Sequence, residues 1–148
     1  MSDPPAGAKD LGLTHVALLV RDPAASLAFY ARYARMQVVH RRKDAQTGRE
    51  VLWLSDRTRP FVIVLIQAER VEGRLEGFAH LGVGCASRAE VDRLCALARD
   101  EGRLGLGPLD SGPPVGYWAF LRDPDGHNLE ISYGQEVGFT VAEMGGGA

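Results

Sequence analysis

The sequence is poor in the features that mark several protein classes. Its longest apolar run, residues 61–66, is far too short to cross a bilayer. Cysteine occurs only twice, as Cys85 and Cys95, without a close C-x-x-C spacing, so we expect reduced thiols rather than a disulfide framework. Positive charge is not in surplus, since the formal net charge is -2. Nucleic acid is therefore not an expected partner.

The first residues also lack the pattern of a targeting segment. Residues 1–9 are polar and rich in proline, with no basic stretch followed by an apolar run, so we expect no signal peptide. We expect residues 1–10 to be flexible and the protein to be cytoplasmic, with no membrane association.

What the sequence does contain is a regular alternation of predicted strands and helices. An apolar run begins it, and Asp22-Pro23 then opens a helix as an N-cap followed by proline at the first helical position. A charged segment with two glycines, residues 69–77, separates two similar halves. We predict strands at 13–20, 37–42, 51–55, 61–67, 78–85, 104–109, 117–122 and 128–133, and helices at 23–35 and from the cap Ser87 to Gly102.

The two halves form an internal repeat. A constant shift of 65 residues places His15 on His80 and Trp53 on Trp118, and it also matches the two helix caps. We therefore predict an α+β fold made of two βαβββ modules, residues 13–67 and 78–133. Together they form one domain over residues 11–134, followed by a loose tail at 135–148.

Three residues of metal-ligand type stand at repeat-related positions. His15 and His80 are equivalent, and Glu130 is equivalent to Leu65 at the same shift. Each alone is more often a structural or solvent-facing residue. Together the three residues favour a functional interpretation, because Glu130 shares a polar face of its strand with Asn128 and Ser132 while the other face is apolar. A buried carboxylate there needs a cation, and two imidazoles and one carboxylate form the facial set that suits Fe(II).

The segments THVALLVRD, FAHLGV and FLRDPDGHNLEI resemble the vicinal oxygen chelate superfamily, which includes glyoxalase I, extradiol dioxygenases, and fosfomycin and bleomycin resistance proteins. The similarity covers about residues 13–133. It implies that the paired modules curl their mixed sheet around a metal-containing cavity. It also implies a homodimer and one divalent metal on His15, His80 and Glu130.

Departures from the family's patterns bear on the reaction. Glyoxalase I carries a fourth protein ligand where Leu65 stands here, and leucine cannot bind a metal. Extradiol dioxygenases usually carry a tyrosine ten residues before the glutamate ligand, where this chain has Phe120. They also use a further histidine as acid or base; the remaining candidates, His40 and His127, are expected at the surface.

Several other residues are candidates for the cavity wall. The two tryptophans line the cavity or fill the core, and the core is the favoured interpretation. Gly82 and Gly84 are interpreted as room for a ligand or for close packing. The candidate lining residues are Leu65, Phe120, Trp118, Asn128 and Trp53.

These observations favour a metal-dependent enzyme whose small substrate chelates the metal through adjacent oxygens. An extradiol-type ring-cleaving dioxygenase with Fe(II) is slightly favoured, because a three-ligand site suits it best. With zinc, nickel or manganese, a glyoxalase-like lyase or isomerase is the alternative. A protein that sequesters a small molecule without turnover is a third reading, and it predicts ligand binding that is independent of metal.

Overall fold

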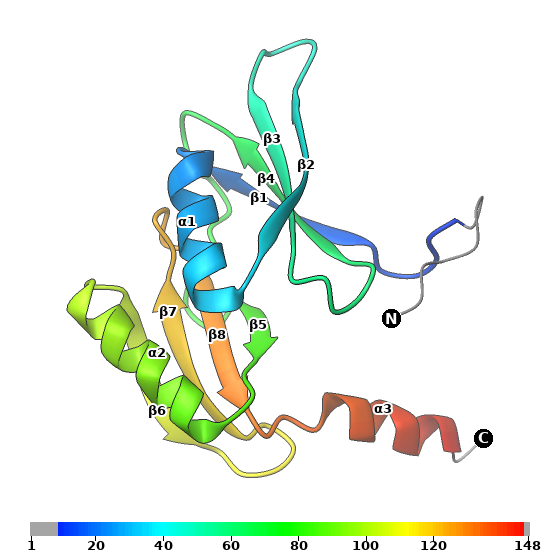
Figure 1. Cartoon of the computed structure of the whole chain (residues 1–148), viewed down its shortest axis with the longest axis vertical. Coiled ribbons are helices and arrows are strands. Elements are labelled where there is room, and N and C mark those ends of the chain that lie inside the picture. Colours follow the sequence, from blue (N-terminus) through cyan, green and yellow to red (C-terminus); the bar gives the residue numbers. More distant parts are fainter. Residues whose placement is uncertain (1–8, 147–148) are drawn as a thin grey trace. The chain divides into compact units, whose positions relative to one another are not determined.

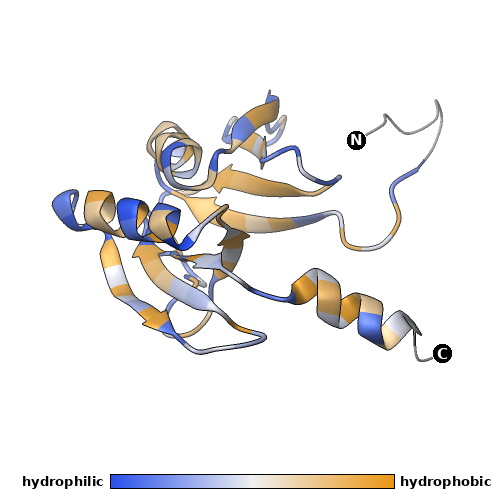
Figure 2. Cartoon of the chain, turned by 60° about the horizontal axis from the view of Figure 1, so that its bottom comes forward, coloured by the Kyte–Doolittle hydropathy of each residue, from blue (hydrophilic) through white to orange (hydrophobic). Residues whose placement is uncertain are grey.

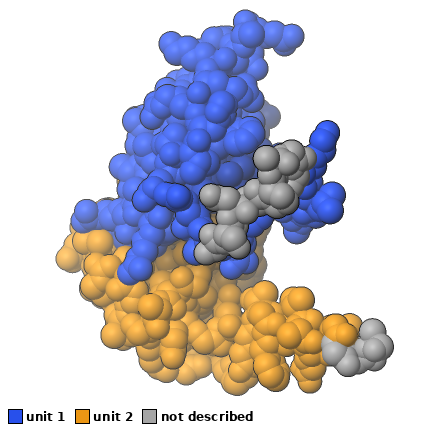
Figure 3. All heavy atoms as spheres, turned by 45° about the vertical axis from the view of Figure 1, so that its right-hand side comes forward, with its two compact units in different colours: residues 1–74 blue, residues 75–148 orange. Residues whose placement is uncertain are grey.

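The computed structural model describes residues 9–146, and the chain divides into two compact units, Met1–Arg74 and Leu75–Ala148 (Figure 3). Each predicted module falls in one unit. Most of the segment expected to be flexible, residues 1–8, lies outside the described residues.

The first unit is a four-stranded sheet with one helix (Figure 1). The strand order is β1-β4-β3-β2, in which β1 runs parallel to β4 and the other neighbours are antiparallel. The predicted order of elements is confirmed, with boundaries shifted by one or two residues. The elements are β1 (His15–Val20), α1 (Pro23–Ala34), β2 (Gln37–Lys43), β3 (Glu50–Ser55) and β4 (Val62–Gln67).

Helix α1 begins and ends where the sequence indicates. The Asp22 side chain accepts hydrogen bonds from the backbone N–H groups of Ala24 and Ala25, which have no partner within the helix. At the other end, Arg35 adopts a left-handed conformation with φ 54°. The buried face includes Phe29 and the neighbouring tyrosines.

The two faces of this sheet differ in burial. Leu18, Leu52 and Leu65 pair side by side across three strands and are almost completely buried, on the face that α1 covers. His15 and Trp53 belong to the alternate residues, which point to the other face, and both side chains are exposed. This accessible face is the one on which a ligand can bind.

The second unit repeats the same topology, with strand order β5-β8-β7-β6 and β5 parallel to β8. Strand β5 is shorter than predicted, because the chain turns before it: the Ala79 N–H donates to the Glu76 carbonyl, and Gly77 has φ 65°. The elements are β5 (Leu81–Gly84), α2 (Arg88–Asp100), β6 (Leu104–Asp110), β7 (Tyr117–Arg122) and β8 (Asn128–Tyr133).

Helix α2 covers one face of this second sheet. Figure 2 shows hydrophilic and hydrophobic residues alternating along it, as expected for a helix with one buried side. Leu121, Leu129 and Ile131 are fully buried on the covered face. The Ser87 side chain caps α2 by accepting a hydrogen bond from the Glu90 N–H, as predicted.

The turn between β7 and β8 corrects one expectation. One carboxylate oxygen of Asp123 accepts hydrogen bonds from the N–H groups of Asp125 and His127, and this organises the turn. His127 is not a surface residue but is 1% exposed, and its Nδ1 accepts a hydrogen bond from the Leu75 N–H. The sequence missed this because the partner lies 52 positions away in the chain.

The loose tail is also a wrong expectation over most of its length. Residues Val137–Gly146 form helix α3, which exposes Val137, Phe139, Val141 and Met144. The glycines near the end of the chain predict irregular structure, but the helix includes Gly145 and Gly146. Among the described helices, none has the length and apolar character needed to span a bilayer.

Candidate metal centre

Two of the three predicted ligands meet in the second unit. His80 precedes β5, Glu130 lies in the middle of β8, and His80 Nε2 is 3.3 Å from Glu130 Oε2. The Glu130 side chain is 8% exposed, and its Oε2 also accepts a 3.3 Å hydrogen bond from Gln135 Nε2. The sequence therefore brings a nearly buried carboxylate against an imidazole.

The other nitrogen of His80 determines what this contact can be. His80 Nδ1 is 2.6 Å from the Phe78 carbonyl oxygen, so Nδ1–H is the donor. In the neutral ring, this leaves the lone pair of Nε2 directed at the Glu130 carboxylate. Two acceptors at 3.3 Å repel each other unless a cation or a proton lies with them. A backbone carbonyl on the second ring nitrogen is also the usual support of a metal-bound histidine.

A glycine beside the carboxylate provides the room for this pair. Gly82 pairs with Glu130 across β5 and β8, and a Cβ atom at Gly82 would lie 3.3 Å from Glu130 Oε2. At Gly84, two residues further on the same face, a Cβ atom would have nothing within 4 Å. The prediction of room at Gly82 is thus matched by a close approach to the candidate ligand.

One aromatic ring packs against the imidazole, and a second packs against the first. The Phe120 ring centroid lies 4.7 Å from that of His80, and Trp118 lies 4.9 Å from Phe120. Phe120 thus contacts His80 directly and Trp118 contacts Phe120, while the lining of a substrate cavity by either residue stays a prediction. Phe120 carries no hydroxyl group, so the ring beside His80 is apolar and supplies no acid at that position.

Asn128 has a different place from the one expected. Its side-chain amide donates to the carbonyl oxygens of Gly77 and Ala79, at 3.0 and 3.2 Å. It therefore holds the segment that carries His80, rather than facing a substrate. Sequence alternation placed Asn128 on the right face of β8 but gave no sign of these contacts.

His15 lies in the first unit, at the start of β1. Its Nδ1 is 2.9 Å from the Thr14 hydroxyl, and the residue is exposed. It lines a cavity of about 580 Å³ on the accessible face of the sheet. The cavity is lined by Asp10, Thr14, His15, Ala17, Val39, Arg42, Trp53, Ser55, Arg59, Pro60, Phe61, Val62, Val64 and Ile66.

The two candidate lining residues from this unit, Trp53 and Leu65, lie on different faces of the sheet. Trp53 is 37% exposed and lines the cavity, so the expectation of a core position is wrong, and its contact with a substrate stays a prediction. Leu65 is fully buried on the α1 face and is not a lining residue. Strand pairing explains why: Ala17 pairs with Val64, whereas its repeat partner Gly82 pairs with Glu130.

Val64 is therefore the structural counterpart of Glu130, one residue away from the position that the constant shift selects. Valine cannot bind a metal, so this unit still supplies no ligand at that position. Within residues 9–146 there is no cluster of three His, Cys, Asp or Glu side chains that could hold a metal. The second unit supplies a pair, and His15 stands in the first.

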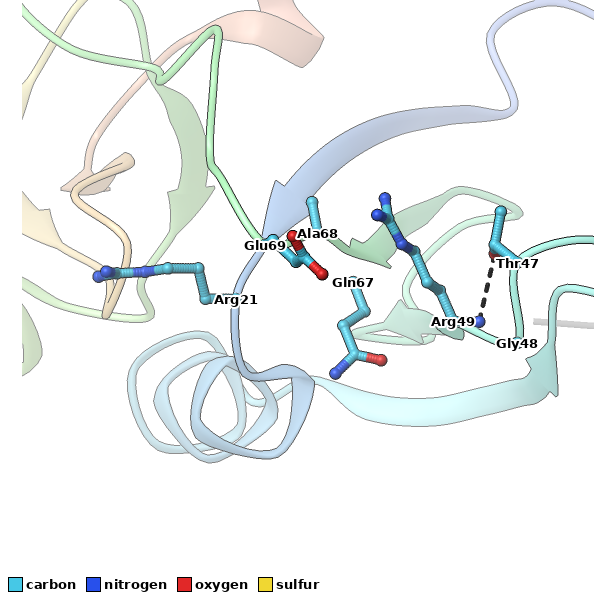
Figure 4. Close-up of a pocket in the computed structure, with 7 residues that line it drawn as sticks. All are labelled: Arg21, Thr47, Gly48, Arg49, Gln67, Ala68 and Glu69. Atoms are coloured by element: carbon cyan, nitrogen blue, oxygen red, sulfur yellow. Dashed lines mark hydrogen bonds between the residues drawn. The ribbon is translucent and has the colours of Figure 1, made fainter.

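A second cavity of the first unit, of about 510 Å³, lies at the turn between β2 and β3 (Figure 4). Arg21 and Arg49 both line it, but Figure 4 shows their guanidinium groups apart, without a common focus. Glu69 also lines it. None of the predicted ligands belongs to this cavity.

Comparison with known proteins agrees with this fold. Residues 12–131 match the model of the Glyoxalase/Bleomycin resistance protein/Dioxygenase superfamily. The chain belongs to this superfamily. An uncharacterized protein of Pseudomonas aeruginosa, PA2024, is 37% identical over 129 residues, which cover 85% of this chain and 91% of that protein.

Solved structures of this superfamily share the fold at low sequence identity. A mutant of the fosfomycin resistance protein FosX of Listeria monocytogenes, in complex with Mn(II) and 1S,2S-dihydroxypropylphosphonic acid, is 18% identical, with a TM-score of 0.67 over 90% of this chain and 99% of that one. Glyoxalase I of Leishmania major is 22% identical, with a TM-score of 0.64 over 92% and 95%. The α+β fold of two repeated modules is thus confirmed.

Proposed function

We propose that this protein is a metal-dependent enzyme whose small substrate chelates one divalent metal through two adjacent oxygens. His15, His80 and Glu130 hold the metal, with His15 supplied by the first unit of the same or of a second chain. We further propose a cytoplasmic homodimer. Iron(II) is the metal that the sequence favours, and manganese, zinc or nickel would use the same donors.

The contact between His80 and Glu130 carries this proposal. The Phe78 carbonyl fixes the proton on Nδ1, and the lone pair of Nε2 then faces a nearly buried carboxylate at 3.3 Å. A divalent cation removes the repulsion between these acceptors and offsets the desolvation of Glu130. The donor set of imidazole and carboxylate fits a first-row divalent metal.

A bound metal would supply Lewis acidity to oxygens that chelate it. The chain's own residues prepare the site in three ways. Asn128 holds the backbone before His80, the Phe78 carbonyl orients the His80 ring, and Gln135 holds one oxygen of Glu130. The Phe120 ring covers one side of the His80 ring, and Trp118 packs against Phe120.

Two reaction types fit such a site, and ring cleavage of a catechol by dioxygen is the one that the sequence favours. Ring cleavage is supported by the absence of a fourth protein ligand, because the position in the first unit that corresponds to Glu130 is Val64. Phe120 and the enclosed His127 weaken it, because neither can act as an acid or base facing His80. A lyase or isomerase that needs only a Lewis acid makes fewer demands on these residues, and the FosX complex contains a diol with Mn(II).

The metal is tested by elemental analysis of protein purified without oxygen. We expect about one divalent metal per chain, and loss of most of it in both His80→Ala and Glu130→Gln. Arg57→Gln, outside the candidate site, should retain it. Full metal content in the two ligand variants would refute the site. Oxygen uptake with catechols by an iron-loaded protein supports ring cleavage, and ligand binding that is unchanged by a chelator supports sequestration instead.

A further inference from the structure

The cavity around His15 has an unusual distribution of charge. Most of its wall is apolar, but two arginines line it, Arg42 from β2 and Arg59 from the turn before β4. Asp10 is the one carboxylate among the residues that line it. With His15 neutral, the lining side chains carry a formal charge of +1, from two positive groups and one negative group.

Neither arginine has a structural task that would explain its position. Within residues 9–146, no hydrogen bond or ion pair joins either guanidinium to another side chain. The pKa of Asp44 is lowered mainly by hydrogen bonds from the backbone N–H groups of Thr47 and Gln46, and the charge of Arg42 contributes least. Arg41, the neighbour of Arg42 in the same strand, pairs with Glu50 at 2.6 Å. The two cavity arginines are thus available to an anion.

A flat apolar surface lies in the same cavity. Trp53 packs against His40, with ring centroids 4.9 Å apart, and remains 37% exposed. Phe61 and Val62 add apolar surface, and the volume of about 580 Å³ suits a small molecule. Indole rings stack well on planar groups, and guanidinium groups bind carboxylates with two parallel hydrogen bonds.

We propose that the substrate is a small planar acid whose negative group is held by Arg42 and Arg59 while its ring lies against Trp53. This inference rests on the proposed function, because His15 is both a lining residue of this cavity and a proposed metal ligand. The acid is then held in the cavity whose wall includes the proposed metal ligand His15. The two arginines determine specificity and take no part in the chemical step.

The test compares an acid with its neutral amide on the full-length, metal-loaded protein. Isothermal titration with 3,4-dihydroxybenzoate and with 3,4-dihydroxybenzamide gives the ratio of the two dissociation constants. We expect the acid to bind about tenfold more tightly, because charge-assisted hydrogen bonds are stronger than neutral ones and partial exposure weakens both. Equal affinities, or no binding of the acid, would overturn the inference.

Matched variants assign the preference to the arginines. Arg42→Gln and Arg59→Gln should each reduce the ratio about threefold to fivefold. Lys43→Gln and Arg57→Gln remove a positive charge close in sequence to Arg42 and Arg59, at residues that do not line the cavity. These two variants should change the ratio of dissociation constants by less than about twofold. Equal effects in all four variants would show a general charge effect and overturn the assignment.

One more variant separates this inference from the proposed function. His80→Ala removes a proposed ligand that lies outside the cavity, so it should weaken both compounds alike and leave their ratio unchanged. If the metal proposal fails but the ratio still depends on Arg42 and Arg59, the acid site stands alone as a binding site. If metal binds as proposed but the ratio is one, the acid site is wrong and the metal centre stands.

Discussion

The pair Gly82 and Gly84 offers a sharp test of the site, because both lie on the same face of β5 and differ in one respect. Alanine at Gly82 places a methyl group 3.3 Å from Glu130 Oε2, whereas alanine at Gly84 meets nothing within 4 Å. Neither residue is among the glycines with positive φ, so neither substitution strains the backbone. Any difference between the two variants therefore reports on the carboxylate.

The expected loss of metal affinity in Gly82→Ala follows from the contacts that hold the Glu130 carboxylate. Glu130 Oε2 contacts both His80 and Gln135 at 3.3 Å, so a shift of a few tenths of an ångström disturbs both contacts. Changes of this kind next to a metal ligand lower affinity by about tenfold to a hundredfold. Unfolding free energies of the two variants should agree within about 0.5 kcal/mol, as for other accessible positions.

Metal affinity is measured by competition with a chromophoric chelator, and stability by urea denaturation of the metal-free protein. We expect Gly82→Ala to bind metal about tenfold more weakly than the natural protein and Gly84→Ala to bind it equally well. Equal affinities in the two variants would refute the reasoning that Glu130 is a ligand held in this position.

Three further outcomes follow from the structure. Leu129→Ala should lower the unfolding free energy by about 3 kcal/mol, because Leu129 is fully buried, whereas Leu106→Ala, 40% exposed, should change it by less than about 1 kcal/mol; urea denaturation checks both. His127→Ala should destabilise the fold by about 2 kcal/mol and leave metal affinity unchanged, since this histidine is an enclosed hydrogen-bond acceptor; a loss of metal without loss of stability would contradict this. Burial raises the pKa of the Cys95 thiol from 9.0 to about 11, so its contribution to stability is present below pH 9 and is lost as the pH rises toward 11. A thiol reagent at pH 8 should then label Cys85 alone in the folded protein and both thiols in denaturant.

The sequence by itself determined the fold class and the order of elements. Caps at Asp22 and Ser87, apolar periodicity and the repeat of 65 residues are local or additive signals, and the structure follows them. The residue types at His15, His80 and Glu130 were likewise visible. Local physics of this kind needs no knowledge of which strands pair.

Only the tertiary structure decided the register of the paired strands and which side chains lie next to each other. Trp53 pairs with Val64, but Trp118 pairs with Ser132, so the two tryptophans stand at different levels of their hairpins despite the common shift. The turns before β4 and β8 differ in length, and a strand's side chains change face with every residue. A shift of one residue therefore moved the counterpart of Glu130 from Leu65 to Val64.

Long-range contacts decided the remaining roles. The burial of His127, the hold of Asn128 on the segment before His80 and the exposure of Trp53 all depend on partners or neighbours far away in the chain. No local pattern records such partners, because hydrogen bonds and packing between distant segments form only once the sheet is assembled. The sequence thus named candidate site residues, and folding determined which atoms of His80 and Glu130 face each other.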